Sequence, residues 1–208
     1  FRRVLFRSNV VTATVNPASV GGSITGSATV CTGTNTTALT LNGITGSVVK
    51  WQSSSSSSFT AATDIANTTN TYTAQNLSAT TYYRAVVKSG VCASANSRTG
   101  TVTVDPASVG GSIAGSKTVC ASGNSSTLTL SGHTGSIEWQ SSADSVNFTA
   151  IGSATASTYT ATNLKVTTWY RAKVTSGVCD PAYSSVAAIR VDSTSTGGTL
   201  SGDATVCT

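Results

Sequence analysis

The sequence predicts an all-β protein, and three observations lead to that prediction. Charged residues make up only 9% of the 208-residue chain, so Ser, Thr, Asn and Gly supply most of its polar surface. Thr and Val favour strands, while Gly and Asn favour turns. No window shows the i, i+3, i+4 apolar spacing of a long helix. Short strand-forming runs separated by turn residues every 8–12 positions are typical of a β-sandwich.

Apolar and polar residues alternate in the second half of the chain, and this predicts about seven short strands. In order, these are a first strand near Ser112–Val119, then Thr127–Leu130, Ser136–Ser141, Asn147–Ile151, Ser157–Ala161, Thr167–Val174 and Val186–Val191. Because successive strand residues point to opposite faces, every second residue should face the core. The residues expected to face inward are Leu128, Leu130, Ile137, Trp139, Tyr170, Ala172 and Val174.

The octapeptide PASVGGSI occurs at Pro17–Ile24 and again at Pro106–Ile113, 89 residues later. Most of the sequence between the copies also repeats, including TTYYRAVVKSGVC and TTWYRAKVTSGVC. A repeat of this length predicts a tandem array of structural modules. We place module 1 at residues 18–106 and module 2 at 107–192. Residues 9–17 are expected to be the last strand of a truncated preceding module, and 193–208 the start of a truncated third.

The net charge of +5 is concentrated at the N-terminus, where FRRVLFRS (Phe1–Ser8) contains Arg2, Arg3 and Arg7. Codons for these eight residues resemble the end of a common short-read sequencing adapter. We therefore interpret them as translated adapter on a fragment of environmental origin, with a native basic arm or the start of a signal peptide as the alternative. Without them, nine basic residues face seven acidic ones and lie scattered, which does not predict a nucleic-acid surface. No apolar run is long enough to span a membrane.

The cysteines follow the repeat, with one near the start and one near the end of each module. Four cysteines allow three pairings, between which sequence alone does not choose. Because each module has its own pair of cysteines at matching positions, the repeat favours bridges within modules, Cys31–Cys92 and Cys120–Cys179. Cys207 is then expected to be unpaired because its module is truncated. Disulfides imply an oxidising compartment, so the chain is expected to be extracellular.

The segments GGSI, TVC, LTLSGHTGSIEWQSS, TYTATNL and TTWYRAKVTSGVC resemble the immunoglobulin-like repeats of Bacteroidetes surface proteins. Such repeats form arrays in gliding-motility adhesins and other cargo of the type IX secretion system, and spacers in secreted enzymes. The resemblance implies tandem immunoglobulin-like β-sandwich modules. One feature departs from antibody domains, where a Tyr precedes the second Cys by two residues. Here Tyr83 and Tyr170 precede the cysteines by nine, so a bridge is expected at one end of the sandwich.

The aromatic residues and one serine are the candidate site residues. Trp51, Trp139, Tyr83 and Tyr170 are predicted to lie in the cores. Trp169 and its counterpart Tyr82 have the opposite phase, which makes them candidates for contact with a ligand. The Asp-Ser-Val sequence around Ser145 resembles a Bacteroidetes O-glycosylation pattern, with an ordinary loop as the alternative.

Catalytic and metal sites are not predicted. The single histidine, His133, has no nucleophile or carboxylate partner that recurs in both copies and is interpreted as a surface residue. No CxxC motif indicates zinc. Asp144 and Asn147 offer oxygen ligands for calcium, but the first copy has a serine run there instead. We therefore expect no enzyme activity, no metal and no cofactor.

The expected function is that of a structural or adhesive stalk in a secreted or cell-surface protein. The alternatives are a module that binds surface glycans and a spacer in a multimodular secreted hydrolase. The expected partners are surface glycans or other cell-surface components and the neighbouring modules of the same chain.

Overall fold

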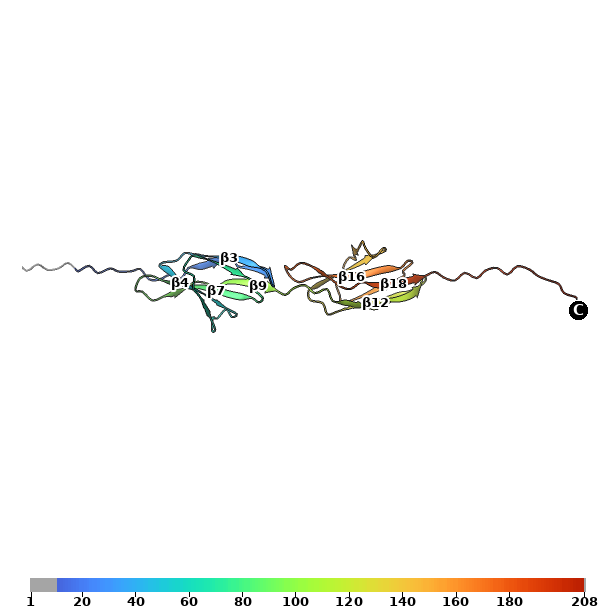
Figure 1. Cartoon of the computed structure of the whole chain (residues 1–208), viewed down its shortest axis with the longest axis horizontal. Helices are drawn as coiled ribbons and strands as arrows, with labels where there is room; N and C mark the ends of the chain where they lie inside the picture. Colours follow the sequence, from blue (N-terminus) through green and yellow to red (C-terminus); the bar gives the residue numbers. More distant parts are fainter. Residues whose placement is uncertain (1–10, 208) are drawn as a thin grey trace, which may run out of the picture. The chain divides into compact units, whose positions relative to one another are not determined.

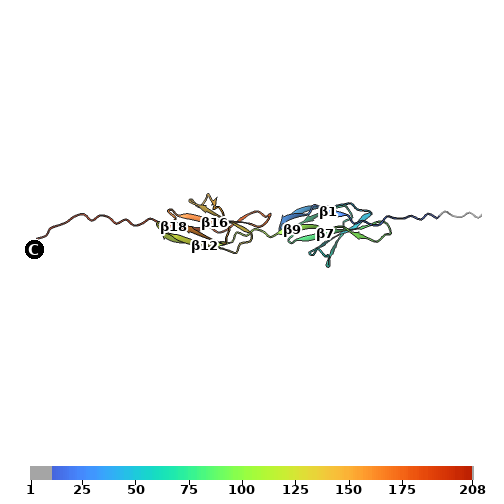
Figure 2. The ribbon, with the colours of Figure 1, turned by 180° about the vertical axis from the view of Figure 1, so that it is seen from behind.

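The computed structural model describes residues 11–207, so the segment interpreted as adapter, 1–8, lies outside the described residues. The chain divides into two compact units, which meet in sequence between Asp105 and Pro106. We call them module 1 and module 2. Both consist of β-strands connected by turns, as two views from opposite sides show (Figure 1 and Figure 2). The prediction of an all-β fold with tandem immunoglobulin-like β-sandwich modules is confirmed.

Module 1 consists of a three-stranded sheet, in the order β1-β3-β6, and a six-stranded sheet. The larger sheet has the order β2-β9-β7-β4-β5, with β8 paired to β7. All pairs are antiparallel except β2 with β9, which run parallel. The strands are β1 (Ser23–Thr25), β2 (Ala28–Cys31), β3 (Thr36–Asn42), β4 (Ser47–Ser54), β5 (Thr63–Ile65), β6 (Thr71–Gln75), β7 (Thr81–Lys88), β8 (Ala95–Asn96) and β9 (Gly100–Asp105).

Module 2 repeats this arrangement, with sheets β10-β12-β15 and β11-β18-β16-β13-β14, and β17 paired to β16. Here β11 and β18 are the parallel pair. The strands are β10 (Ser112–Ala114), β11 (Lys117–Cys120), β12 (Ser125–Ser131), β13 (Ser136–Ser142), β14 (Thr149–Ala150), β15 (Thr158–Thr162), β16 (Thr168–Thr175), β17 (Ala182–Tyr183) and β18 (Ala187–Asp192).

The first predicted strand of module 2 is in fact two strands in different sheets. Gly115, with φ of 110°, separates β10 from β11, and Gly26 does the same in module 1 with φ of 96°. L-residues with a side chain rarely adopt such values, which makes glycine the natural residue at this break. The chain therefore crosses from the small sheet to the edge of the large one. The prediction also missed β17, a strand of only two residues.

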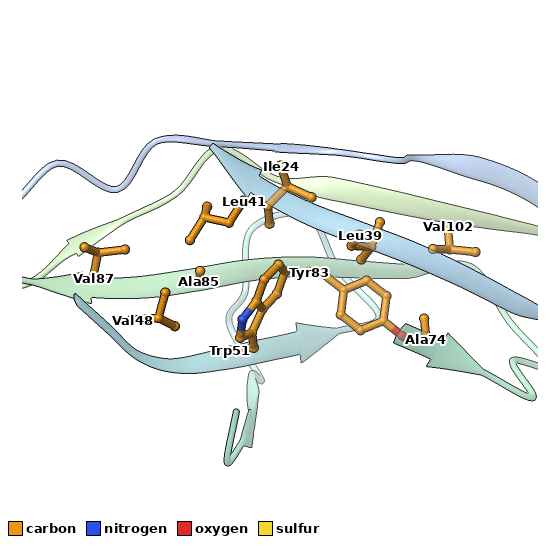
Figure 3. Close-up of a cluster of buried hydrophobic side chains, with 10 residues drawn as sticks. All are labelled: Ile24, Leu39, Leu41, Val48, Trp51, Ala74, Tyr83, Ala85, Val87 and Val102. Carbon is orange, nitrogen blue, oxygen red and sulfur yellow. The ribbon is translucent and has the colours of Figure 1, made fainter. Parts of the chain in front are cut away.

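The core of each module fills the space between its two sheets. In module 1, Leu39 and Leu41 on β3 face Ala85 and Val87 on β7, and all four are nearly inaccessible to solvent (Figure 3). The same alternation on β12 and β16 buries the equivalent residues of module 2. This burial of apolar surface is the main favourable term in the folding of each sandwich.

Each core contains one fully buried tryptophan, Trp51 or Trp139. Its indole N–H donates to a backbone carbonyl, that of Thr69 at 2.9 Å or Ala156 at 2.8 Å. A buried polar atom needs a hydrogen-bond partner, and the indole N–H has one. The tryptophan therefore fills the core with apolar surface and leaves no N–H unpaired.

A row of three aromatic rings continues from each tryptophan. In module 1 the ring of Tyr72 lies 5.8 Å from Trp51 and 5.3 Å from Tyr83. Burial, followed by the neighbouring Tyr72, raises the pKa of Tyr83 to about 12. Burial likewise raises the pKa of Tyr170 in module 2 to about 12. Both tyrosines are therefore neutral structural groups at physiological pH.

The described terminal segments contain no strand, and the assignment of 9–17 and 193–208 to neighbouring modules stays a prediction. Residues 11–17 form no strand, although 9–17 were expected to be one, and residues 193–207 also form none. A strand needs a hydrogen-bonded partner. In module 2, for example, β10 is held by β12. Within residues 11–207, neither segment has such a partner.

Candidate functional site

The repeated PASVGGSI segment forms the entry to each module. In module 2, Ser108 Oγ accepts a hydrogen bond from the N–H of Ser176 at 2.9 Å, and Val109 forms a β-bridge with Thr134. Gly110 is buried so tightly that a Cβ atom there would overlap the backbone carbonyl of Tyr183. Gly21 is pressed against Asn96 in the same way in module 1. The octapeptide thus recurs because each module needs it to dock its incoming chain.

The cysteines correct the predicted pairing. Cys31 and Cys179 are disulfide-bonded, whereas Cys92, Cys120 and Cys207 are free thiols. Neither predicted bridge, Cys31–Cys92 nor Cys120–Cys179, exists, because each would use one of the free thiols. The prediction was wrong because the sequence repeat shows that each module contains two cysteines but does not show how far apart they lie in space.

An asparagine near the start of each module, buried in module 2 and half-buried in module 1, was not identified from the sequence. In module 2, Asn124 Nδ2 donates to the carbonyls of Cys120 and Leu164, both at 2.8 Å, and its Oδ1 accepts from the N–H of Leu164 at 2.9 Å. Asn35 makes the same three contacts in module 1. Its recurrence four residues after a cysteine was the available signal. The role is structural, since every contact is to the backbone of the same module.

Arg171 lies on the outer face of the large sheet of module 2. Its guanidinium carbon is 4.2 Å from the ring centroids of both Phe148 and Tyr183, and its Nε donates to Gln140 Oε1 at 2.8 Å. In module 1, Arg84 stacks on Phe59 alone, at 4.3 Å. An arginine held by stacking and a hydrogen bond stabilises the sheet surface. Its outward direction agrees with the expected alternation.

Trp169 lies in an open groove of about 690 Å³ on module 2. Its side chain is half-buried and is flanked across β18 and β11 by Arg190 and Lys117, both exposed. Ser145 lines the same groove. The groove therefore combines an aromatic face with two positive charges. In module 1, Tyr82 occupies the position of Trp169, but the positions equivalent to the two cations hold Ala28 and Thr103.

Ser145 is exposed at a tight turn with φ of 62°. The turn is held by Asp144, whose Oδ1 accepts from Ser142 Oγ at 2.7 Å and from the N–H of Asn147 at 2.7 Å. These hydrogen bonds, led by that from the Asn147 N–H, hold the pKa of Asp144 well below its usual range. The carboxylate considered as a calcium ligand thus serves to order the loop. Modification of Ser145 stays a prediction.

His133 is half-buried, and its Nδ1 has no hydrogen-bond partner within residues 11–207. The interpretation of His133 as a surface residue therefore holds only in part. Across the same residues, no three His, Cys, Asp or Glu side chains gather as a metal site would require. No helix in the described part of the chain has the length and apolar character needed to cross a membrane.

Comparison with solved structures supports the fold. A chain of the crystal structure of a mouse coronavirus receptor-binding domain complexed with its murine receptor is similar over 82% of this chain and all of that one, with 12% identity and a TM-score of 0.55. A marsupial T cell receptor is similar over 84% of this chain and 74% of that one, with 13% identity and a TM-score of 0.51. Similarity at such low identity supports the fold alone.

Sequence comparison identifies the family. No curated protein matches the chain. One family model matches it twice, over residues 20–106 and 109–193, and its description is "Domain of unknown function (DUF8696)". These two matches cover most of the chain and coincide with the two β-sandwiches. The chain therefore belongs to the DUF8696 family and carries two copies of its domain.

Proposed function

We propose that this chain is part of a stalk in a secreted or cell-surface protein, with no catalysis of its own. The stalk separates an adhesive or catalytic domain from the surface to which the protein is attached. The proposal includes an origin among Bacteroidetes surface proteins, which the sequence resemblance suggests. Disulfide-bonded cysteines support an oxidising, extracellular location.

The observation that carries the proposal is the path of the chain through each module. Strands β2 and β9 are parallel neighbours, with Ala28 opposite Val102 and Cys31 opposite Asp105. The chain enters beyond the end of β7, where Ser19 Oγ accepts a hydrogen bond from the N–H of Ser89. It leaves beyond the start of β7, because Thr81 lies opposite Val102 and β9 continues to Asp105, so entry and exit lie at opposite ends of the sandwich. Module 2 has the same arrangement in β11 and β18. A module that receives the chain at one end and releases it at the other adds its own length to the reach of an array.

The proposal is tested by measuring reach. One end of the chain is attached to a bead, and the other end carries a characterised binding domain. The ligand of that domain is fixed to a surface beneath a polymer brush, and brushes of several thicknesses are compared. We expect capture through thicker brushes when one extra copy of residues 107–192 is inserted after residue 192. A flexible Gly-Ser insert of equal residue count is the matched control and should extend reach less. Capture that does not depend on the number of modules would contradict the stalk function.

Glycan binding is the second candidate function, and the groove around Trp169 favours it. An indole face can stack on a sugar ring, while Lys117 and Arg190 supply positive charge beside it. This combination suits an oligosaccharide that carries carboxylate or sulfate groups. Binding is assigned to module 2, because the equivalent surface of module 1 has no cation.

A printed array of sulfated and uronic-acid oligosaccharides tests this second candidate. Replacement of Trp169 by alanine is expected to weaken binding by about tenfold or more, which corresponds to about 1.4 kcal/mol. Added salt is also expected to weaken binding, because two of the contacts are ionic. Tyr82→Ala, at the equivalent position of module 1, is the matched control and should leave binding unchanged. Equal losses in both variants, or no binding by the parent chain, would exclude the groove as a glycan site.

A further inference from the structure

The two cysteines of a module lie too far apart to bond with each other. Cys31 ends β2 opposite Asp105, whereas Thr81, which begins β7, lies opposite Val102. Cys31 therefore lies beyond the start of β7, and Cys92 lies beyond its end. The eight residues of β7 alone span roughly 23 Å at about 3.3 Å per residue. A disulfide needs Cα atoms within about 7 Å.

Each cysteine instead lies where the chain enters or leaves its module. Cys92 Sγ is 3.4 Å from the carbonyl oxygen of Pro17 in the entry segment. In module 2, Cys179 Sγ lies 3.2 Å from the carbonyl oxygen of Pro106, again at the entry. Cys120 ends β11 opposite Asp192, the last residue of β18, where the chain leaves. We call Cys92 and Cys179 the entry cysteines, and Cys31 and Cys120 the exit cysteines.

The bonded states differ between equivalent positions. The exit cysteine of module 1, Cys31, is disulfide-bonded, and that of module 2, Cys120, is free. The entry cysteine of module 2, Cys179, is bonded, and that of module 1, Cys92, is free. Entry and exit positions can therefore both form a disulfide. The bonded exit cysteine, Cys31, is followed by a complete module, and the bonded entry cysteine, Cys179, is preceded by one. Within the described residues, no complete module follows Cys120 or precedes Cys92.

We propose that disulfides in this array run from module to module, with each exit cysteine bonded to the entry cysteine of the module that follows. Cys120 and Cys92 are then attachment points for a following and a preceding module of the same polypeptide. Cys207 repeats the position of Cys120 after 87 residues and is the exit cysteine of the next module. One rule thus accounts for all three free thiols.

Each bond forms by thiol–disulfide exchange with a low-molecular-weight disulfide such as oxidised glutathione. The two cysteine thiols lose two protons and two electrons, and the oxidant takes them up to become two thiols. The exchange requires exposed thiols. Cys120 is exposed and Cys92 is partly so. The inference rests on the positions of the cysteines and not on the proposed function, so either can fail without the other.

The test inserts a second copy of residues 107–192 after residue 192 and oxidises the purified protein with a glutathione buffer. The inserted copy carries Val178→Ile, at an exposed position, to change the mass of its entry-cysteine peptide, and Cys120→Ser to remove its own exit cysteine. Alkylation followed by non-reducing peptide mapping identifies the bonded cysteines. We expect Cys120 to lose its free thiol and to appear bonded to the inserted counterpart of Cys179. In the unmodified chain Cys120 should remain alkylatable, and no peptide should join it to Cys179.

A Cys120→Ser variant of the extended protein is the matched control. The inserted entry cysteine should then react with the alkylating reagent, while thermal unfolding of the modules stays within a few degrees of the parent. A Cys120 that stays free in the extended protein would overturn the proposal. A peptide that joins Cys120 to Cys179, or Cys31 to Cys92, would overturn it as well.

Discussion

Replacement of Trp139 by alanine is expected to destabilise module 2 by about 3–5 kcal/mol, the usual cost of removing a large buried aromatic side chain. Trp139 is completely inaccessible to solvent, and its ring packs 5.7 Å from that of Tyr159. The substitution leaves a cavity between the sheets and removes the N–H donor to the carbonyl of Ala156. Single domains have only about 5–15 kcal/mol of stability, so much of it would be lost.

Calorimetry of the whole chain measures this loss. For a module of this size, 1 kcal/mol shifts the melting temperature by about 4–8 °C, so the transition of module 2 is expected at least about 12 °C below its position in the parent chain. Proteolysis near the lower transition should cut within residues 107–192. Trp169→Ala is the matched control, since that side chain is half-buried at the surface, and its shift should be small. A Trp139→Ala shift of only a few degrees would show that the core closes around the cavity.

Replacement of Gly110 by alanine is expected to destabilise module 2 by about 2–3 kcal/mol through steric overlap. The added methyl group would meet the backbone of Tyr183 and Ser184, which is held in β17 and in the hydrogen bond from the N–H of Ser184 to Ala172. No side chain can rotate away to make room. The entry segment would therefore leave its place, with loss of the bridge between Val109 and Thr134.

Hydrogen exchange locates the damage caused by Gly110→Ala. The amides of Val109, Thr134 and Ser176 should exchange faster, while those of β12 change less. Gly152→Ala is the matched control, because a Cβ atom there meets nothing within 4 Å. That variant should be neutral or slightly stabilising. Unchanged protection of the three amides would mean that the entry segment tolerates a side chain.

The sheets could be predicted because their signals are local. Alternation alone places Tyr170, Ala172 and Val174 toward the core, where each has at most 2% of its surface exposed. The split of the first strand had a visible signal in the repeated glycines Gly26 and Gly115, which the prediction did not use. Strand β17 has only two residues, which is too few to show an alternation in the sequence. It is a strand because it pairs with β16.

Contacts between distant segments could not be predicted in the same way. The three hydrogen bonds of Asn124 join segments up to 40 residues apart, and nothing in the neighbouring sequence indicates their partners. The groove around Trp169 depends on β11 lying beside β18, a parallel pairing that no hairpin turn specifies. The disulfide prediction failed for the same reason. Positions along a repeat do not show which end of a sandwich each cysteine occupies.

The parallel pairing of β2 with β9 also determines how a module responds to tension. Pulling on the two ends of the chain draws β2 and β9 in opposite directions along their own axes, so the ladder is loaded in shear. All four residue pairs from Ala28–Val102 to Cys31–Asp105 then carry the load together, whereas a hairpin pulled open at its end breaks one pair at a time. The edge strand that a split first strand places beside β9 is thus expected to resist tension as a unit, a property that the proposed stalk function requires.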